Sequence, residues 1–248
     1  MLKLKIVEQK EKITNDWTVE KVSKEYPPRT WESVFENAKD EIKDISDILE
    51  EDKKINGERI PNNCDLFRAF HLTPLHKVRV VIVGQDPYFS RIPDGRPLAT
   101  GLAFSIPRDA AIPSSLRNIY KELKDSIPGF VVPNHGDLTS WSLQGVFLLN
   151  SCLTVRENDA SCHKQIWDGF IKKVINAILE ANPRCIFVAW GNNAQKVASK
   201  FVGEKAVVLT SSHPSGLSSH RGFFGCGHFP EINRLLITQK SEPINWNL

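Results

Sequence analysis

The stretch that decides the fold is Val78-Arg79-Val80-Val81-Ile82-Val83-Gly84-Gln85-Asp86-Pro87-Tyr88. Its first six residues are β-branched apart from one arginine, and they are too few for a buried helix, so they predict a strand. Three further apolar runs share this character, over residues 145–149, 185–190 and 206–209. Near-continuous apolar strands are typical of a sheet that is covered on both faces.

Helical patterns separate these runs along the chain. Apolar residues recur three or four apart over residues 31–52, 114–126, 166–181, 192–201 and 230–238, and a shorter helix is expected over 65–71. Strands that alternate with helices imply a mainly parallel sheet. We therefore predict an α/β fold, a three-layer sandwich with a central, mainly parallel four-stranded sheet flanked by helices. It forms one domain over residues 31–248, and residues 1–30 are expected to be a weakly structured N-terminal arm.

Composition limits the class of protein and its compartment. The 248 residues are 41% hydrophobic and 25% charged, which is ordinary for a soluble globular chain. The net charge of +3 suits a DNA partner only if the positive charge gathers on one face. The five cysteines form no CxxC pair, so neither a disulfide framework nor a structural zinc site is expected. No apolar run approaches the roughly 20 residues that span a bilayer, so we expect a soluble intracellular protein without a membrane partner.

Polar residues follow each of the four predicted strands. Asp86 comes after the first strand, Asn150 after the second, Asn192 after the third and His213 after the fourth. Ligands of open α/β sheets bind at this carboxyl edge. Each residue alone has an ordinary structural explanation, since a carboxylate or histidine after a strand often only caps a turn. Their convergence at one edge predicts a functional site.

The motifs at these strand ends resemble those of one enzyme family. GQDPY (84–88) and GLAFS (101–105) resemble the water-activating and base-stacking motifs of the family 1 uracil-DNA glycosylases. LLNSCLTV (148–155) resembles their base-reading segment, and HPSGLSSHRGFFGCGHF (213–229) resembles their leucine loop. The resemblance runs in the family's order over residues 60–248, whereas GQDPY alone would be only suggestive. It implies a DNA repair glycosylase that flips deoxyuridine out of DNA, hydrolyses its N-glycosidic bond and releases free uracil, leaving an abasic site.

The resemblance assigns the chemistry to two residues. Asp86 would hold the attacking water and face the cationic sugar that develops as the bond breaks. His213 would donate a hydrogen bond to the departing uracil oxygen, for which a neutral imidazole suffices. No metal or cofactor is implied.

Four residues would bind the base. Asn150 would read the uracil edge, because an amide offers both a donor and an acceptor. Phe104 would stack on the flipped base, and Tyr88 would exclude the methyl group of thymine. Gln85 would add backbone and polar contacts to the pyrimidine.

The remaining residues assigned by the resemblance would bind DNA. Leu217 resembles the wedge that fills the space left by the flipped base. Contacts to the DNA backbone, which position the duplex without reading its sequence, would come from Ser115, Asn192, Ser215 and Ser218.

Departures from the family pattern include three features that bear on the site. Phe89 stands where a histidine is usual after GQDPY, and Gly216 stands where the leucine loop usually has proline. The loop over residues 89–100 is longer than expected and holds Arg91 and Arg96, so contact with DNA is one reading of it.

Two other functions stay open at this point. One is a non-catalytic DNA-binding or replication-scaffold protein on the same fold. The other is a nucleotide-binding α/β enzyme, although the sequence lacks both GxxxxGK[ST] and GxGxxG at a strand-helix turn. The expected partners are uracil-containing single- and double-stranded DNA, with protein inhibitors of the family as candidates, and a monomer is the simpler state. The compartment would be the cytoplasm in a prokaryote, and the nucleus or another DNA-containing compartment otherwise.

Overall fold

The computed structural model describes residues 12–202 and 206–248. Its main sheet has four parallel strands in the order β3-β2-β5-β6. The strands are β3 (Val146–Asn150), β2 (Val80–Gly84), β5 (Ile186–Trp190) and β6 (Val207–Ser211). Every residue of β2, β3 and β5 is buried, whereas β6 at the edge is partly exposed. The predicted parallel four-stranded sheet is confirmed.

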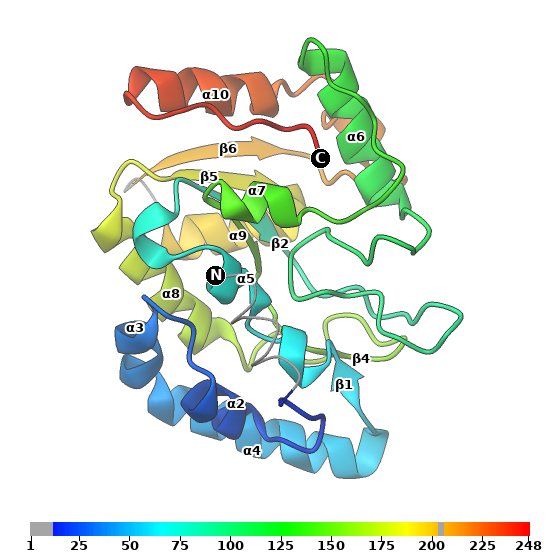
Figure 1. The fold of residues 1–248 in the computed structure, drawn as a ribbon, viewed down its shortest axis with the longest axis vertical. Helices are drawn as coiled ribbons and strands as arrows, with labels where there is room; N and C mark the ends of the chain where they lie inside the picture. Colours follow the sequence, from blue (N-terminus) through cyan, green and yellow to red (C-terminus); the bar gives the residue numbers. More distant parts are fainter. Residues whose placement is uncertain (1–11, 203–205) are drawn as a thin grey trace.

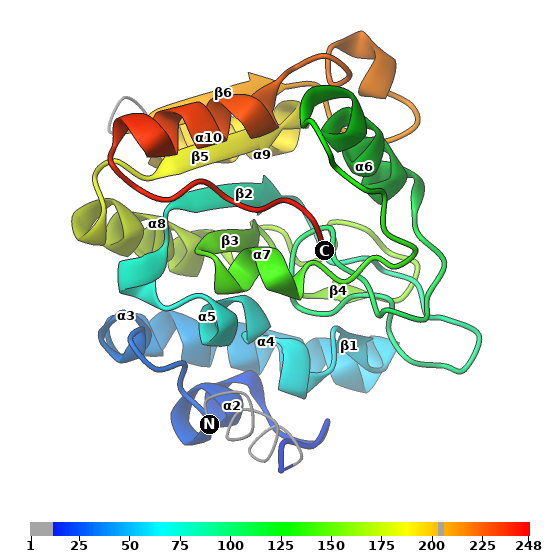
Figure 2. The ribbon, with the colours of Figure 1, turned by 45° about the horizontal axis from the view of Figure 1, so that its top comes forward.

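Helices cover both faces of this sheet. On one side lie α5 (Arg68–Leu72) and α7 (Thr139–Leu143), which contact β3, together with α10 (His228–Thr238). On the other side lie α8 (Asp168–Ala181) and α9 (Gly191–Phe201), which contact each other, and α9 also contacts β5 and β6. Figures 1 and 2 show these three layers, as the sequence predicts. Helix α6 (Ser114–Ser126) lies beyond the carboxyl ends of the strands of the main sheet.

Three N-terminal helices pack below the sheet in the view of Figure 1: α2 (Val19–Glu25), α3 (Glu32–Asn37) and α4 (Lys39–Asn56). Helix α2 differs from the weakly structured arm expected over residues 1–30. The buried side chains of Val19 and Val22 lie three residues apart and pack α2 against α4, and the Thr18 side chain caps its first turn. Two apolar residues in one short helix give too weak a pattern to be recognised. Residues 1–11 of the expected arm lie outside the described residues.

A second, two-stranded sheet braces the segment that follows β3. In it β1 (Arg59–Ile60) pairs antiparallel with β4 (Val155–Arg156). Arg156 also makes an ion pair with Asp52 of α4, and His163 Nε2 lies 3.2 Å from the same carboxylate. These contacts hold residues 155–163 against α4, so the segment is fixed on the side away from the sheet.

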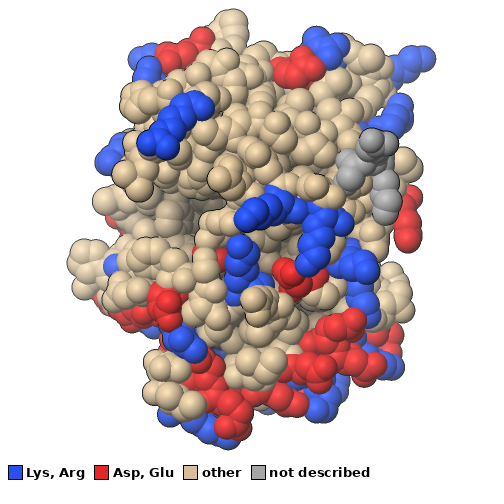
Figure 3. All heavy atoms as spheres, turned by 180° about the vertical axis from the view of Figure 1, so that it is seen from behind, with Lys and Arg blue, Asp and Glu red and all other residues tan. Residues whose placement is uncertain are grey.

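Charge is unevenly distributed over the surface. Seen from behind, Lys and Arg side chains gather across the middle of the molecule beside a hollow (Figure 3). Acidic side chains gather at the lower end, where α4 lies in Figure 1. A net charge of only +3 is therefore compatible with a positive face. None of the helices within the described ranges is long and apolar enough to cross a membrane.

Candidate active site

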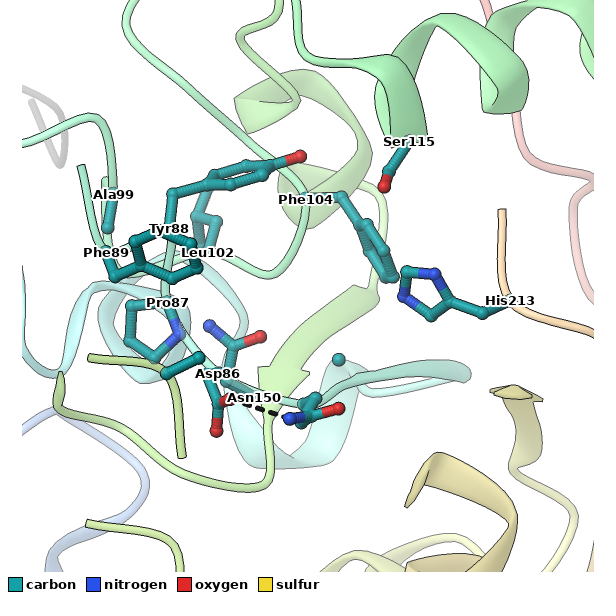
Figure 4. Close-up of a pocket in the computed structure, with 13 residues that line it drawn as sticks. Asp86, Pro87, Tyr88, Phe89, Ala99, Leu102, Phe104, Ser115, Asn150 and His213 are labelled. Atoms are coloured by element: carbon teal, nitrogen blue, oxygen red, sulfur yellow. Dashed lines mark hydrogen bonds between the residues drawn. The ribbon is translucent and has the colours of Figure 1, made fainter. Parts of the chain in front are cut away.

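A pocket of about 200 Å³ opens at the carboxyl ends of β2 and β3 (Figure 4). Its size is below the roughly 300–1,000 Å³ of sites for drug-sized ligands, which suits a ligand as small as one base. The pocket is lined by residues 84–89, Ala99, Leu102, Phe104, Ser115, Asn150, Ala160 and His213. It therefore brings together all six residues predicted for catalysis and base binding, as well as Ser115.

Asp86 lies two residues after Gly84, the last residue of β2, and its two carboxylate oxygens are in different surroundings. Oδ2 accepts hydrogen bonds from Gln85 Nε2 at 2.8 Å and from Ser161 Oγ at 3.0 Å. Oδ1 is buried and has no hydrogen-bond partner among the described residues. Buried polar atoms without partners are rare in folded proteins, and a functional site is one of the places where they occur. One oxygen thus fixes the carboxylate, and the other keeps its lone pairs for a ligand.

The side chain of Gln85 is used within the protein. Its Nε2 donates to Asp86 and, at 2.7 Å, to Ser161 Oγ, while its Oε1 accepts from Asn193 Nδ2. Both amide hydrogens and the carbonyl oxygen therefore have partners. Of the two contacts predicted for Gln85, only the backbone contact to a pyrimidine is left free.

His213 is held as a neutral imidazole with a free donor. Its Nδ1 accepts a hydrogen bond from the backbone N–H of Ser215 at 3.0 Å, so the ring proton lies on Nε2. Burial lowers the pKa of His213 below its ordinary value, which also favours the neutral form. Its position depends on Gly191, since a Cβ built there would lie 2.7 Å from the Cβ of His213. The turn-capping and the chemical interpretations of His213 are therefore compatible, because different ring nitrogens serve them.

The ring of Phe104 forms one wall of the pocket beside His213 (Figure 4). The two ring centroids are 5.9 Å apart, and the centroid of Trp190 is 5.6 Å from that of Phe104. The backbone of Phe104 is in the left-handed region, with φ at 64°. This conformation is uncommon for a bulky residue and costs about 1–3 kcal/mol, and such residues cluster at active sites.

Asn150 lies opposite Gly84 in the register of β3 and β2. It is buried at the pocket wall, and no residue of the described chain hydrogen-bonds its side-chain amide. A Cβ built on Gly84 would lie 2.2 Å from Asn150 Oδ1, so only glycine permits this close approach. The amide is thus fixed by packing and keeps its donor and acceptor for a ligand.

Two aromatic residues complete the wall. Burial raises the pKa of Tyr88, and its buried hydroxyl has no hydrogen-bond partner in the described chain. Phe89 is 42% exposed at the pocket, where the family's usual histidine would offer polar atoms. The region beyond Tyr88 is therefore more apolar than the family pattern implies.

A second pocket, of about 330 Å³, adjoins the first. It shares Gln85 and His213 with the first pocket and is also lined by Asn192, Ser218 and Arg221. Helix α9 begins here at Gly191, and the first backbone N–H groups of a helix favour anions. Two of the predicted DNA-binding residues, Asn192 and Ser218, thus lie at a site suited to a phosphate.

Leu217 lies in the loop between β6 and α10, and its side chain is 91% exposed. Ser218 Oγ donates to the carbonyl of His213 at 2.8 Å, and it lies 2.9 Å from Ser215 Oγ. Asn118 of α6 donates to the carbonyl of Pro214 at 2.8 Å. Ser215 and Leu217 line neither pocket, but these bonds fix the loop beside them despite Gly216.

The arginines of the long loop over residues 89–100 are already paired. Arg91 makes an ion pair with Glu157 at 2.9 Å, and Arg96 makes ion pairs with Asp94 and Asp109 at 2.6 and 2.5 Å. The loop also closes on itself, since the N–H of Leu98 donates to the carbonyl of Ser90. These pairs weaken the reading of the loop as a source of free positive charge for DNA.

Sequence reasoning missed Ser161, Asn193 and Asn118, which hold the predicted residues in place. Asn193 stands next to the predicted Asn192 in the segment AWGNNAQ, which is a weak signal. Ser161 and Asn118 reach Asp86 and Pro214 only through the tertiary fold. No local pattern marks them.

Comparisons with known proteins identify the family of this chain. The family model of the Uracil DNA glycosylase superfamily matches residues 70–237. A protein named uracil-DNA glycosylase from Francisella tularensis subsp. novicida is 44% identical over 223 residues, which cover 88% of this chain and 99% of that protein. The crystal structure of mimivirus uracil-DNA glycosylase matches with a TM-score of 0.83 at 31% identity, covering 88% of this chain and 86% of that one. A variant of the mimivirus protein in complex with UGI matches with a TM-score of 0.85 at 29% identity, covering 95% and 98%.

The family model and the Francisella relative both cover most of the chain. The chain belongs to the uracil-DNA glycosylase superfamily.

Proposed function

We propose that this protein is a monofunctional uracil-DNA glycosylase, which hydrolyses the N-glycosidic bond of deoxyuridine in DNA and releases free uracil. The observation that carries the proposal is the convergence of Asp86, Asn150 and His213 on one base-sized pocket. Each of the three comes from the end of a different strand. A scaffold protein that only binds DNA would not need all three groups in one pocket.

Bond cleavage leaves a positive charge on the sugar and a negative charge on the base. Asp86 faces the first charge and accepts a hydrogen bond from the water that attacks the sugar carbon. His213 meets the second charge, because its Nε2–H can donate to the uracil oxygen that gains electron density. Donors and charges that are already oriented stabilise such a transition state without reorganisation.

Recognition of uracil rests on the amide of Asn150. Uracil offers an acceptor and a donor on the edge that an amide complements. Cytosine presents the opposite pattern and would leave the buried amide unpaired, which discriminates strongly. Phe104 stacks on the base, and Tyr88 occupies the space that the methyl group of thymine would need.

A base in a duplex reaches this pocket only after it is flipped out. Leu217 is the wedge, since an apolar side chain that projects from a fixed loop can enter the base stack. Ser115, Asn192, Ser215 and Ser218 bind phosphates on either side. Because Arg91 and Arg96 of the 89–100 loop are already paired, the phosphate contacts come from these four residues and from Arg221 in the second pocket.

Partners and compartment follow from the same proposal. The substrate is uracil in single- or double-stranded DNA. One structural relative is described as a complex with UGI, and we propose a proteinaceous inhibitor as a partner of this chain as well. The protein acts as a monomer, in the cytoplasm of a prokaryote or otherwise in a compartment that contains DNA.

Base release from matched oligonucleotides tests the proposal. The oligonucleotides carry uracil, thymine or cytosine at one position and are incubated with the protein in a chelating buffer. Free uracil and an abasic site are expected from the uracil strand alone, and the double variant Asp86→Asn with His213→Ala is expected to lose this release. Full activity in the double variant would refute the assignment. Retention of uracil-containing DNA by the unaltered protein without base release would favour the scaffold function instead.

A further inference from the structure

Ser161 lies on the loop between β4 and α8, and its side chain reaches Asp86. Its Oγ donates to Asp86 Oδ2 at 3.0 Å and accepts from Gln85 Nε2 at 2.7 Å. Gln85 Nε2 also donates to the same Oδ2. The three side chains therefore form a closed triangle of hydrogen bonds on one carboxylate oxygen.

The backbone at Ser161 adopts a conformation that its residue type does not favour. Its φ is 64°, in the left-handed region that glycine and asparagine occupy far more readily than serine. Such a conformation persists only when the surroundings determine it. The loop is braced close to Ser161 on both sides, because the N–H of Arg156 donates to Cys162 Sγ, and Asp52 of α4 contacts both Arg156 and His163.

Glycine would adopt the backbone conformation at residue 161 with less strain than serine. The serine side chain must therefore have a role of its own. The hydroxyl has two partners, and both belong to the GQDPY segment. Its neighbour Ala160 also lines the pocket. The loop therefore places one hydroxyl against the carboxylate and contributes Ala160 to the pocket wall.

We propose that Ser161 is a positioning residue for catalysis, whose hydroxyl acts with the Gln85 amide to fix the orientation of the Asp86 carboxylate. The proposal rests on the proposed catalytic role of Asp86. Two donors hold Oδ2 in one place, so Oδ1 stays directed away from them and has no donor among the described residues. Asn193 extends the arrangement, because it donates to Gln85 Oε1 and so fixes which end of that amide faces Asp86.

Three substitutions of Ser161 distinguish the effect of its hydroxyl from the effect of its backbone conformation. Ser161→Gly removes the hydroxyl and relieves the backbone, Ser161→Ala removes the hydroxyl alone, and Ser161→Asn keeps a donor on a residue that tolerates the left-handed region. Asn158→Gly is the matched control, because Asn158 lies on the same loop with φ at 59° and is exposed. Uracil release is measured under single-turnover and steady-state conditions, with thermal unfolding of each variant.

The glycine and alanine variants are expected to lose about tenfold in kcat, the effect of one hydrogen bond to a charged group, while KM changes by less than about twofold. The asparagine variant is expected to recover most of the activity. The control and the glycine variant are expected to unfold at no lower a temperature than the unaltered protein.

Unaltered kcat in Ser161→Gly would overturn the proposal, as would an equal loss of activity in Asn158→Gly, which would point to the loop as a whole. Asp86→Asn is measured alongside. If that variant kept full activity, the catalytic role of Asp86 would fail. If it lost activity while Ser161→Gly did not, only the role of Ser161 would fail.

Discussion

Substitution of Gly84 by a larger residue gives the sharpest test of the proposal that Asn150 recognises the base. A Cβ at this position would lie 2.2 Å from Asn150 Oδ1 and 2.9 Å from the Cβ of Ala103, whereas ordinary contact begins at 3.4 Å. Gly84→Ala therefore forces the Asn150 amide back by more than 1 Å, because Ala103 blocks the other direction. A misplacement of about 1 Å in a positioned group can cost on the order of a hundredfold in rate. We expect a loss of this size in kcat/KM for uracil release.

The assay is single-turnover release of uracil from a single-stranded oligonucleotide, which removes base flipping from the measurement. Overpacking at a buried strand end costs about 1–3 kcal/mol, so thermal unfolding must show that Gly84→Ala is folded at the assay temperature. Gly169→Ala on α8 is the control, since its Cβ would meet only Glu41 at an ordinary 3.5 Å. Unaltered kcat/KM in a folded Gly84→Ala protein would refute the reasoning that Asn150 reads the base from this position.

Three more predictions address other parts of the structure. Tyr88→Ala is expected to gain measurable release of thymine, and retained uracil release without such a gain would exclude Tyr88 as the residue that rejects the methyl group. Leu217→Ala is expected to change the free energy of unfolding by less than about 0.5 kcal/mol, because the side chain is 91% exposed, yet to slow uracil release from duplex more than from single-stranded DNA; equal slowing on both substrates would contradict the wedge. Burial lowers the pKa of His71 to about 4 in the folded protein. As pH drops below about 6.5, His71 is protonated in the unfolded chain but stays neutral in the folded one, so the free energy of unfolding falls. His71→Phe keeps the stacking on Tyr26 and should reduce the loss of unfolding free energy between pH 7 and pH 5 by about 2 kcal/mol, measured by urea unfolding, whereas an unaltered loss would show that His71 does not titrate in this way.

The fold could be predicted where burial leaves a continuous pattern in the sequence. The apolar run before Gly84 predicts a buried strand, and helix α6 spans residues 114–126 as predicted. Helix α2 could not be predicted, because Val19 and Val22 give it only two buried residues. The pairing of β1 with β4 joins residues nearly a hundred apart and has only two residues in each strand, so no local pattern could reveal it.

The candidate site likewise contains residues that the sequence predicts and residues that only the structure reveals. Asp86, Asn150 and His213 stand at the ends of recognisable strands within motifs, so sequence alone brings them to one edge. The residues that orient them come from elsewhere: Ser161 from a loop whose backbone conformation suits glycine, and Gly191 from a turn that allows His213 to approach. Their roles depend on distances between atoms that only the folded chain defines. The same holds for the Gln85 side chain, whose partners Ser161 and Asn193 come from other parts of the chain.

The register of β3 connects the hydrophobic core to the chemistry. Asn150 lies opposite Gly84 because Phe147 lies opposite Val81, three residues earlier on the same strand. The ring of Phe147 is buried against Trp31 with centroids 5.1 Å apart, so a slip of one residue would move it to the other face of the sheet. The same slip would place Leu149 or Ser151 opposite Gly84, and neither side chain offers the donor and acceptor of an amide. The stacking of two aromatic rings at the far end of the strand therefore selects the residue that faces the pocket, and we expect substitutions of Phe147 to alter uracil release even though they lie outside the site.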